Sequence, residues 1–144
     1  MLYGIQITAI DGGKYLVTCR DIPECTFTSS SELEALQDAT KMLPGTIELF
    51  YRQKKRAIPF PSKIQNGEKP VLIPLRLQAK MLLWNTIVNK GLNLSTFAEA
   101  IGTSPSNVQR LVDFSKPASV DRIEEALANL GYLFDVSLVE ETND

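Results

Sequence analysis

Residues 92–112, LNLSTFAEAIGTSPSNVQRLV, decide the fold of the C-terminal half, because they predict two short helices joined by a tight turn. Asn93 is a favourable N-cap for the first helix, which Gly102 ends. Ser104 caps a second helix that opens with Pro105, where a missing N–H costs nothing. We expect the second helix to bury one apolar face, formed by Val108, Leu111 and Val112.

The opposite face of that second helix carries side chains that hydrogen-bond to base edges or phosphates. These candidate DNA-binding residues are Ser106, Asn107, Gln109 and Arg110. Two short helices of an all-α bundle are the alternative. A further helix capped by Ser119, with an apolar face at Ile123, Ala126, Leu127 and Leu130, weighs against it. Residues 91–131 resemble the lambda-repressor-like helix-turn-helix class.

Two features separate this stretch from a strong DNA binder. Leu94 and Pro105 stand where that class often carries Gln, and proline cannot donate a hydrogen bond to a base. Residues 71–144 contain six Lys or Arg against nine Asp or Glu, a formal charge of −3, whereas DNA binders are usually basic. We therefore expect weak binding by one copy and a symmetric dimer on the DNA.

The composition excludes several classes of protein. At 144 residues, with 44% hydrophobic and 22% charged residues, the chain fits two small globular domains. We find neither an apolar run long enough for a membrane span nor a signal peptide, and expect a cytoplasmic location. Cys19 and Cys25 are expected to be reduced, and histidine is absent. The sequence thus predicts no metal site, no cofactor and no nucleophile paired with imidazole.

The N-terminal half predicts an antiparallel-rich α+β domain spanning residues 1–75, in the order β-β-β-α-β. Its expected strands are residues 3–10, 15–20, 25–28 and 71–75. Ser31 and Glu34 form a capping box that opens the helix. We expect the helix to bury a stripe at Leu36, Thr40, Leu43, Ile47 and Phe50, and expect Pro44-Gly45 to kink or split it.

A second domain, residues 76–144, is expected to begin with a helix over residues 76–90. Its apolar face comprises Leu77, Met81, Trp84, Ile87 and Val88. Residues 132–139 alternate as a strand that has no sheet in this helical domain. The same strand of a second copy is its simplest partner, which predicts a homodimer through the C-terminal domain, or a higher oligomer.

Taken together, these elements resemble the HicB antitoxins of bacterial HicAB toxin–antitoxin pairs. The most specific pieces are Tyr15 followed by Asp21-Ile22-Pro23, the capped helix at residues 31–39, and IPFPS at residues 58–62. The resemblance implies an N-terminal domain with a partial ribonuclease H-like fold that blocks HicA, a small basic toxin that cleaves RNA. It implies a C-terminal domain that dimerises and binds the operator of its own operon. Glu24, Pro44-Gly45 and Pro105 depart from the commonest pattern of the family.

The residues themselves favour an inhibitor over an enzyme. A ribonuclease H site needs about four convergent carboxylates for two metals, the first on the opening strand, and residues 3–10 contain no acid. Inhibition instead needs a surface complementary to a basic RNA-binding protein. The candidate toxin-binding residues are Asp11, Asp21, Glu24, Glu32, Glu34 and Asp38.

Three functions remain open at this point. The first is an antitoxin that also regulates transcription of its operon. The second is a stand-alone helix-turn-helix regulator whose N-terminal domain binds a small ligand. The third and weakest is a metal-dependent nuclease.

Overall fold

A four-stranded antiparallel sheet forms the centre of the N-terminal part. The computed structural model describes residues 1–141, so the last three residues of the expected second domain lie outside it. The strand order is β3-β2-β1-β4, with β1 at Leu2–Ile10, β2 at Lys14–Cys19, β3 at Phe27–Ser29 and β4 at Lys69–Leu72. The expected hairpin of β1 and β2 is confirmed, and it turns through Gly12 and Gly13 at φ +82° and +72°.

Two strand boundaries differ from expectation. β3 begins at Phe27 because the preceding residues make a turn, in which the Cys25 N–H donates to the Ile22 carbonyl at 3.0 Å. That turn buries the Ile22 and Cys25 side chains under the sheet. β4 ends at Leu72; the Ile73 N–H still donates to the Met1 carbonyl at 3.1 Å, and Pro74 then begins the turn into α2.

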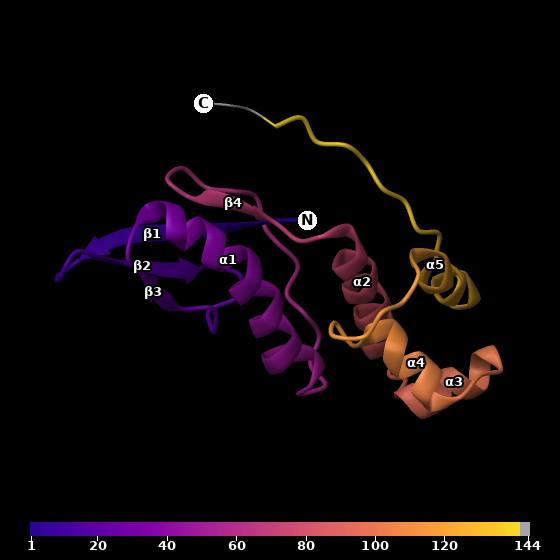
Figure 1. Cartoon of the computed structure of the whole chain (residues 1–144). Coiled ribbons are helices and arrows are strands. Elements are labelled where there is room, and N and C mark those ends of the chain that lie inside the picture. Colours follow the sequence, from indigo (N-terminus) through magenta and orange to yellow (C-terminus); the bar gives the residue numbers. More distant parts are fainter. Residues whose placement is uncertain (142–144) are drawn as a thin grey trace.

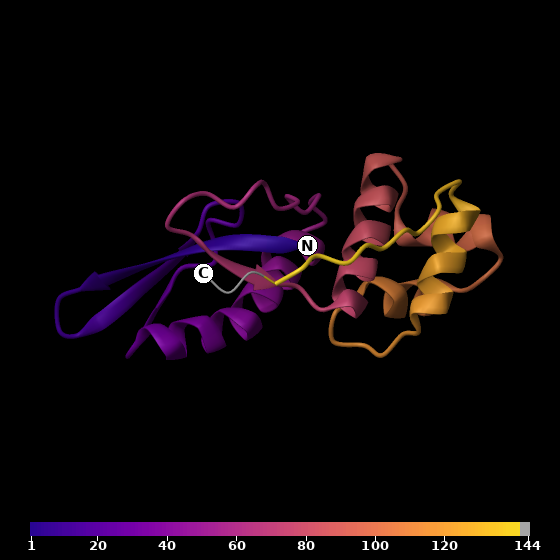
Figure 2. The ribbon, with the colours of Figure 1, turned by 90° about the horizontal axis from the view of Figure 1, so that it is seen from above.

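Helix α1 (Glu32–Ile47) covers one face of the sheet (Figures 1 and 2). Ser31 caps it by accepting from the Glu34 N–H at 3.1 Å. The buried stripe is Ala35, Ala39, Leu43 and Ile47, so the expected stripe was wrong at three positions: Leu36 is half-buried, and Thr40 and Phe50 are exposed. Because Ala35 and Ala39 are small, the helix axis lies close to the sheet, and the larger neighbouring side chains do not fit between them.

The expected break at Pro44-Gly45 is absent, and α1 runs through both residues. The helix widens afterwards into a π-helical turn, η1 (Glu48–Arg52), which directs both terminal residues of the turn inward. There the Arg52 guanidinium donates to both carboxylate oxygens of Glu48, and the pair is largely buried. A buried ion pair therefore ends this helix.

The segment after η1 joins the two parts of the chain. The Asn85 side chain accepts from the Ile58 N–H at 2.8 Å and donates to the Ile58 carbonyl at 2.7 Å. Trp84 donates to the Arg56 carbonyl at 2.8 Å, and the Tyr3 hydroxyl donates to the Pro59 carbonyl at 2.6 Å. This segment is thus bonded to the sheet on one side and to α2 on the other.

Four helices follow, in positions close to those expected. They are α2 (Leu75–Asn89), α3 (Leu94–Ile101), α4 (Pro105–Val112) and α5 (Val120–Asn129). The caps at Asn93, Ser104 and Ser119 are confirmed, and Gly102 ends α3 in the left-handed region at φ +72°. Helix α2 lies between the sheet and the other helices (Figure 1), so it also buries Lys80 and Asn85, beyond the single face expected.

The C-terminal segment is extended but unpaired. Residues 132–141 follow α5 without joining any strand in this chain, so the expected strand at residues 132–139 does not form within one copy. No sheet edge of the same chain lies against it to complete a ladder. Leu133 and Leu138 are 94% and 102% exposed, an unusual situation for leucine. In Figure 1 the segment leaves α5 and runs back towards the N-terminal part.

Candidate nucleic-acid and partner interfaces

The four candidate DNA-binding residues lie together on α4. Ser106, Asn107 and Arg110 are exposed, and Gln109 is half-buried. Asn107 donates its side-chain amide to the Thr103 hydroxyl at 2.9 Å, which holds it at the edge of α4. The arrangement presents hydroxyl, amide and guanidinium groups on one helix edge.

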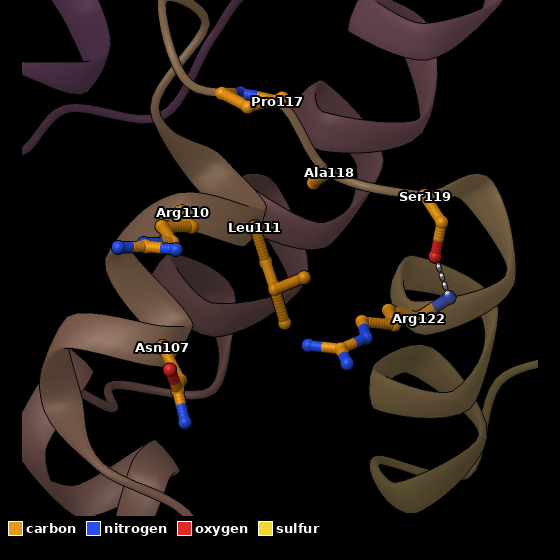
Figure 3. A pocket seen from close by; sticks show the side chains of 7 residues that line it. All are labelled: Asn107, Arg110, Leu111, Pro117, Ala118, Ser119 and Arg122. Atoms are coloured by element: carbon orange, nitrogen blue, oxygen red, sulfur yellow. Dashed lines mark hydrogen bonds between the residues drawn. The ribbon is translucent and has the colours of Figure 1, made fainter.

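A pocket of about 360 Å³ separates this edge from α5. It is lined by Asn107, Arg110 and Leu111 from α4, and by Pro117, Ala118, Ser119 and Arg122 from the loop and first turn of α5 (Figure 3). Arg122 was missed in the sequence. The available signal was its position three residues after a Ser cap, where the Ser119 hydroxyl accepts from the Arg122 N–H at 3.2 Å.

The buried side chain of Lys80 binds the C-terminal end of α4. Its ammonium donates to three main-chain carbonyls, those of Arg110 at 3.0 Å, of Lys116 at 2.5 Å and of Asp113. Burial, reinforced by the nearby charge of Arg76, lowers the pKa of Lys80 to about 8. The carbonyls at the C-terminal end of α4 and in the following turn are thereby satisfied by one buried cation.

The buried ion pair of η1 acts on the same turn. Burial alone would raise the pKa of Asp113, but hydrogen bonds from Ser115 and the positive charge of Arg52 hold it below its usual value. Glu48 in turn favours the charged form of Lys80. The end of the N-terminal helix and the end of α4 therefore share one electrostatic environment.

Two of the six candidate toxin-binding acids are engaged inside the chain. Asp21 accepts from the Ser62 N–H and hydroxyl, both at 2.9 Å. Glu24 accepts from the Tyr51 hydroxyl at 2.5 Å and lies 3.7 Å from the Arg56 guanidinium. Burial would raise the pKa of Glu24, yet these two partners outweigh it and lower the pKa. Both acids hold the segment after η1 against the sheet.

The other four acids remain on the surface. Asp11 lies in the exposed β1–β2 turn, and Glu32 and Glu34 occupy the exposed first turn of α1. Asp38 accepts from the Ser29 hydroxyl at 2.8 Å and is otherwise exposed. The β1–β2 turn and the start of α1 lie at the same end of the sheet, away from α2–α5 (Figures 1 and 2). This end is the acidic end of the N-terminal part.

Residues 1–141 hold no group of three or more His, Cys, Asp or Glu side chains that would bind a metal ion. Cys19 and Cys25 are buried free thiols, and burial raises the pKa of Cys25 to about 11. The helices within these residues are all too short or too polar to cross a membrane.

Comparison with known proteins gives a consistent answer over most of the chain. A family model described as a HicB-like antitoxin of bacterial toxin–antitoxin systems matches residues 2–82. Antitoxin HicB 2 of Photorhabdus laumondii subsp. laumondii is 36% identical over 131 residues, covering 91% of each chain. Antitoxin HicB of Pseudomonas fluorescens (strain Pf0-1) is 29% identical over 130 residues, which cover 90% of this chain and 88% of that protein. Antitoxin HicB of Escherichia coli K12 is 27% identical, over 91% and 94% respectively.

These relatives match the sheet, α1 and most of the helical part together, so the likeness is not confined to one motif. The resemblance inferred from Asp21-Ile22-Pro23 and residues 58–62 is thereby confirmed. The chain belongs to the HicB-like family of bacterial antitoxins.

Proposed function

We propose that this protein neutralises a HicA-type RNA-cleaving toxin and represses transcription of its own operon. Residues 1–75 would bind the toxin, and residues 76–144 would dimerise and bind DNA. The observation that carries the proposal is the likeness to proteins named antitoxin HicB over about nine-tenths of both chains. As an antitoxin it acts by covering its partner, in the bacterial cytoplasm, and we assign it no catalytic residue and no cofactor.

The acidic end of the N-terminal part supports toxin binding. Glu32 and Glu34 are exposed in the first turn of α1, and Asp11 is exposed in the turn at the same end of the sheet. Exposed acids of this kind attract and orient a basic RNA-binding protein. Asp21 and Glu24, in contrast, stabilise the antitoxin itself, because each already has partners within the chain.

The exposed polar edge of α4 supports DNA binding. Two short helices, α3 and α4, are joined by a turn at Gly102, and we interpret this pair as a helix-turn-helix. In the proposal α4 enters the major groove, where Asn107, Gln109 and Arg110 meet base edges and Ser106 meets the backbone. Pro105 occupies the first position of α4, so base contacts begin beyond it.

The extended C-terminal segment supports dimer formation. It leaves main-chain groups and apolar side chains exposed along residues 132–141. Pairing with the same segment of a second copy would hydrogen-bond these main-chain groups and bury these side chains. It would also allow the α4 helices of both copies to bind one duplex. The weak affinity expected for a single copy makes this second contact necessary.

Co-expression with the product of the neighbouring small gene tests the antitoxin role. We expect a stable complex in which RNA cleavage is silenced. A partner that is not retained, together with unchecked cleavage, would favour a stand-alone regulator instead. In that case the N-terminal part offers a second pocket of about 410 Å³, lined in part by Gln6, Arg20 and Glu68, in which to look for a ligand.

A further inference from the structure

The positive charges of the helical part are unevenly distributed. Six Lys or Arg side chains lie between residues 71 and 141. Three are engaged: Lys80 is buried, Arg76 donates to the Phe114 carbonyl at 3.2 Å, and Lys90 lies 5.4 Å from the centre of the Tyr132 ring. The remaining three are Arg110, Lys116 and Arg122.

Two of these three cations line one place, the pocket between α4 and α5, and the third lies next to it in the sequence. Arg110 and Arg122 line it, and Lys116 directly precedes the lining residue Pro117. No Asp or Glu is among the lining residues. Within residues 1–141 neither guanidinium is in an ion pair, whereas Arg20, Arg52 and Arg56 all are. A half of the chain that is negatively charged overall is therefore locally positive here.

The geometry of the pocket suits a phosphate oxygen. In Figure 3 the Arg122 guanidinium extends from α5 into the gap beside α4, and Asn107 lines the α4 side of that gap while its amide is bonded to Thr103. The Ser119 hydroxyl accepts from the Arg122 N–H as the helix cap and keeps its own proton to donate, so the guanidinium and this hydroxyl are both available donors. A planar guanidinium with parallel N–H groups matches phosphate better than an ammonium does.

The position of the pocket indicates which phosphate. It borders the polar edge of α4, and Asn107 and Arg110 belong both to that edge and to the pocket lining. A duplex whose major groove receives α4 carries its sugar–phosphate backbone along the sides of that helix. Arg122, which lines the α5 side of the pocket, would then contact the DNA backbone.

We propose that the pocket between α4 and α5 binds a backbone phosphate of duplex DNA, with Arg122 as its principal contact. The proposal rests on the DNA-binding function proposed above and assigns it a contact on a helix outside the α3–α4 pair. Arg122 then contributes affinity that does not depend on sequence, while the edge of α4 discriminates between bases. Asp121, next in the chain, is exposed but does not line the pocket.

Replacement of Arg122 by Gln in the full chain tests the assignment. The probe is a duplex carrying the sequence upstream of the gene, with binding followed by fluorescence anisotropy over a series of salt concentrations. We expect R122Q to weaken binding by roughly tenfold and to reduce the slope of log affinity against log salt by about one per copy. R122K should keep the slope and recover part of the affinity, because it keeps the charge but not the planar donor pair.

K41Q is the matched control, since Lys41 is an exposed cation on α1, far from α4. It removes the same charge and should leave both the affinity and the slope unchanged. Thermal unfolding of R122Q should match the wild-type protein, because the Arg122 side chain is exposed. Equal loss of affinity in K41Q and R122Q would show a general charge effect and overturn the proposal.

Further outcomes separate this proposal from the function on which it rests. A wild-type protein that binds no duplex would refute the DNA-binding function, and the phosphate contact with it. A wild-type protein that binds the duplex while R122Q keeps the same affinity and slope would overturn the phosphate contact alone. Saturable binding of inorganic phosphate without DNA, lost in R122Q, would reassign the pocket to a free anion and also overturn it.

Discussion

Replacement of Lys80 by methionine should change how the stability of the protein depends on pH. Burial lowers the pKa of the Lys80 ammonium to about 8, from the 10.5 of a solvated lysine. Between these values the unfolded chain binds more protons than the folded chain, so the free energy of unfolding rises with pH. The destabilisation that comes from burying the charge is fully present below pH 8 and is removed above about pH 10.5.

The size of this effect follows from the two pKa values. A difference of about 2.5 pKa units corresponds to roughly 3 kcal/mol when the titration is complete. Between pH 7 and pH 9 the wild-type protein should gain about 1.3 kcal/mol relative to the methionine variant. At pH 7 the variant itself should be less stable by roughly 2–4 kcal/mol, because the carbonyls of Arg110, Asp113 and Lys116 lose their donor.

Urea unfolding of both proteins at pH 7, 8 and 9 measures the effect. Only the difference between the proteins is interpreted, because deprotonation of Cys25 and Tyr51, whose pKa values burial raises to about 11 and about 12, acts on both alike. A difference in unfolding free energy that stays constant from pH 7 to pH 9 would refute the argument. It would mean that Lys80 titrates as a solvated side chain.

Three further predictions concern the proposed interfaces and the junction between the two parts of the chain. Reversing Glu32 and Glu34 to Lys should slow association with the toxin by about tenfold at low salt, as measured by stopped-flow fluorescence, with little effect at high salt. If the proposed dimer forms through the C-terminal segment, replacing Val136 and Leu138 by Asp should give a monomer in light scattering, and should weaken the proposed operator binding without loss of toxin inhibition. Asn85→Ala should lower the free energy of unfolding by about 2–4 kcal/mol, because it removes both hydrogen bonds to the main chain of Ile58.

Controls decide what each result means. Reversal of Glu124 and Glu125, two exposed acids on α5, alters the net charge equally but should leave the toxin association rate unchanged. An equal effect of both reversals would place the toxin elsewhere or reduce the effect to net charge. A variant that remains dimeric with Asp at residues 136 and 138 would exclude the C-terminal segment as the dimer contact.

Local signals in the sequence predicted most of the helix and strand positions. The caps at Asn93, Ser104 and Ser119 depend on one side chain and a backbone N–H three residues later, so a short window is sufficient. The buried face of α1 was misplaced because Ala35 and Ala39 give little hydrophobic signal, although their small size is what brings the helix to the sheet.

Features that depend on distant partners could not be predicted in this way. Asp21 and Glu24 read as free surface acids because their partners, Ser62 and Tyr51, lie 41 and 27 residues further along the chain. The burial of Lys80 requires three carbonyls at least 30 residues away, so its charge alone predicted a surface position.

The contacts of α2 argue that toxin binding and DNA binding are mechanically connected. A division between residues 75 and 76 separates Ile58 from Asn85 and the Arg56 carbonyl from Trp84, so neither half keeps its buried polar groups satisfied. The same helix holds the end of α4 through Lys80, in the electrostatic environment set by Glu48 of η1. A toxin that shifts α1 would therefore move Glu48, whose charge acts on the Lys80 ammonium that binds the end of α4. Coupling between the two proposed sites would act through Lys80 and Asn85 of α2, and it requires that the two sites favour different arrangements of these contacts.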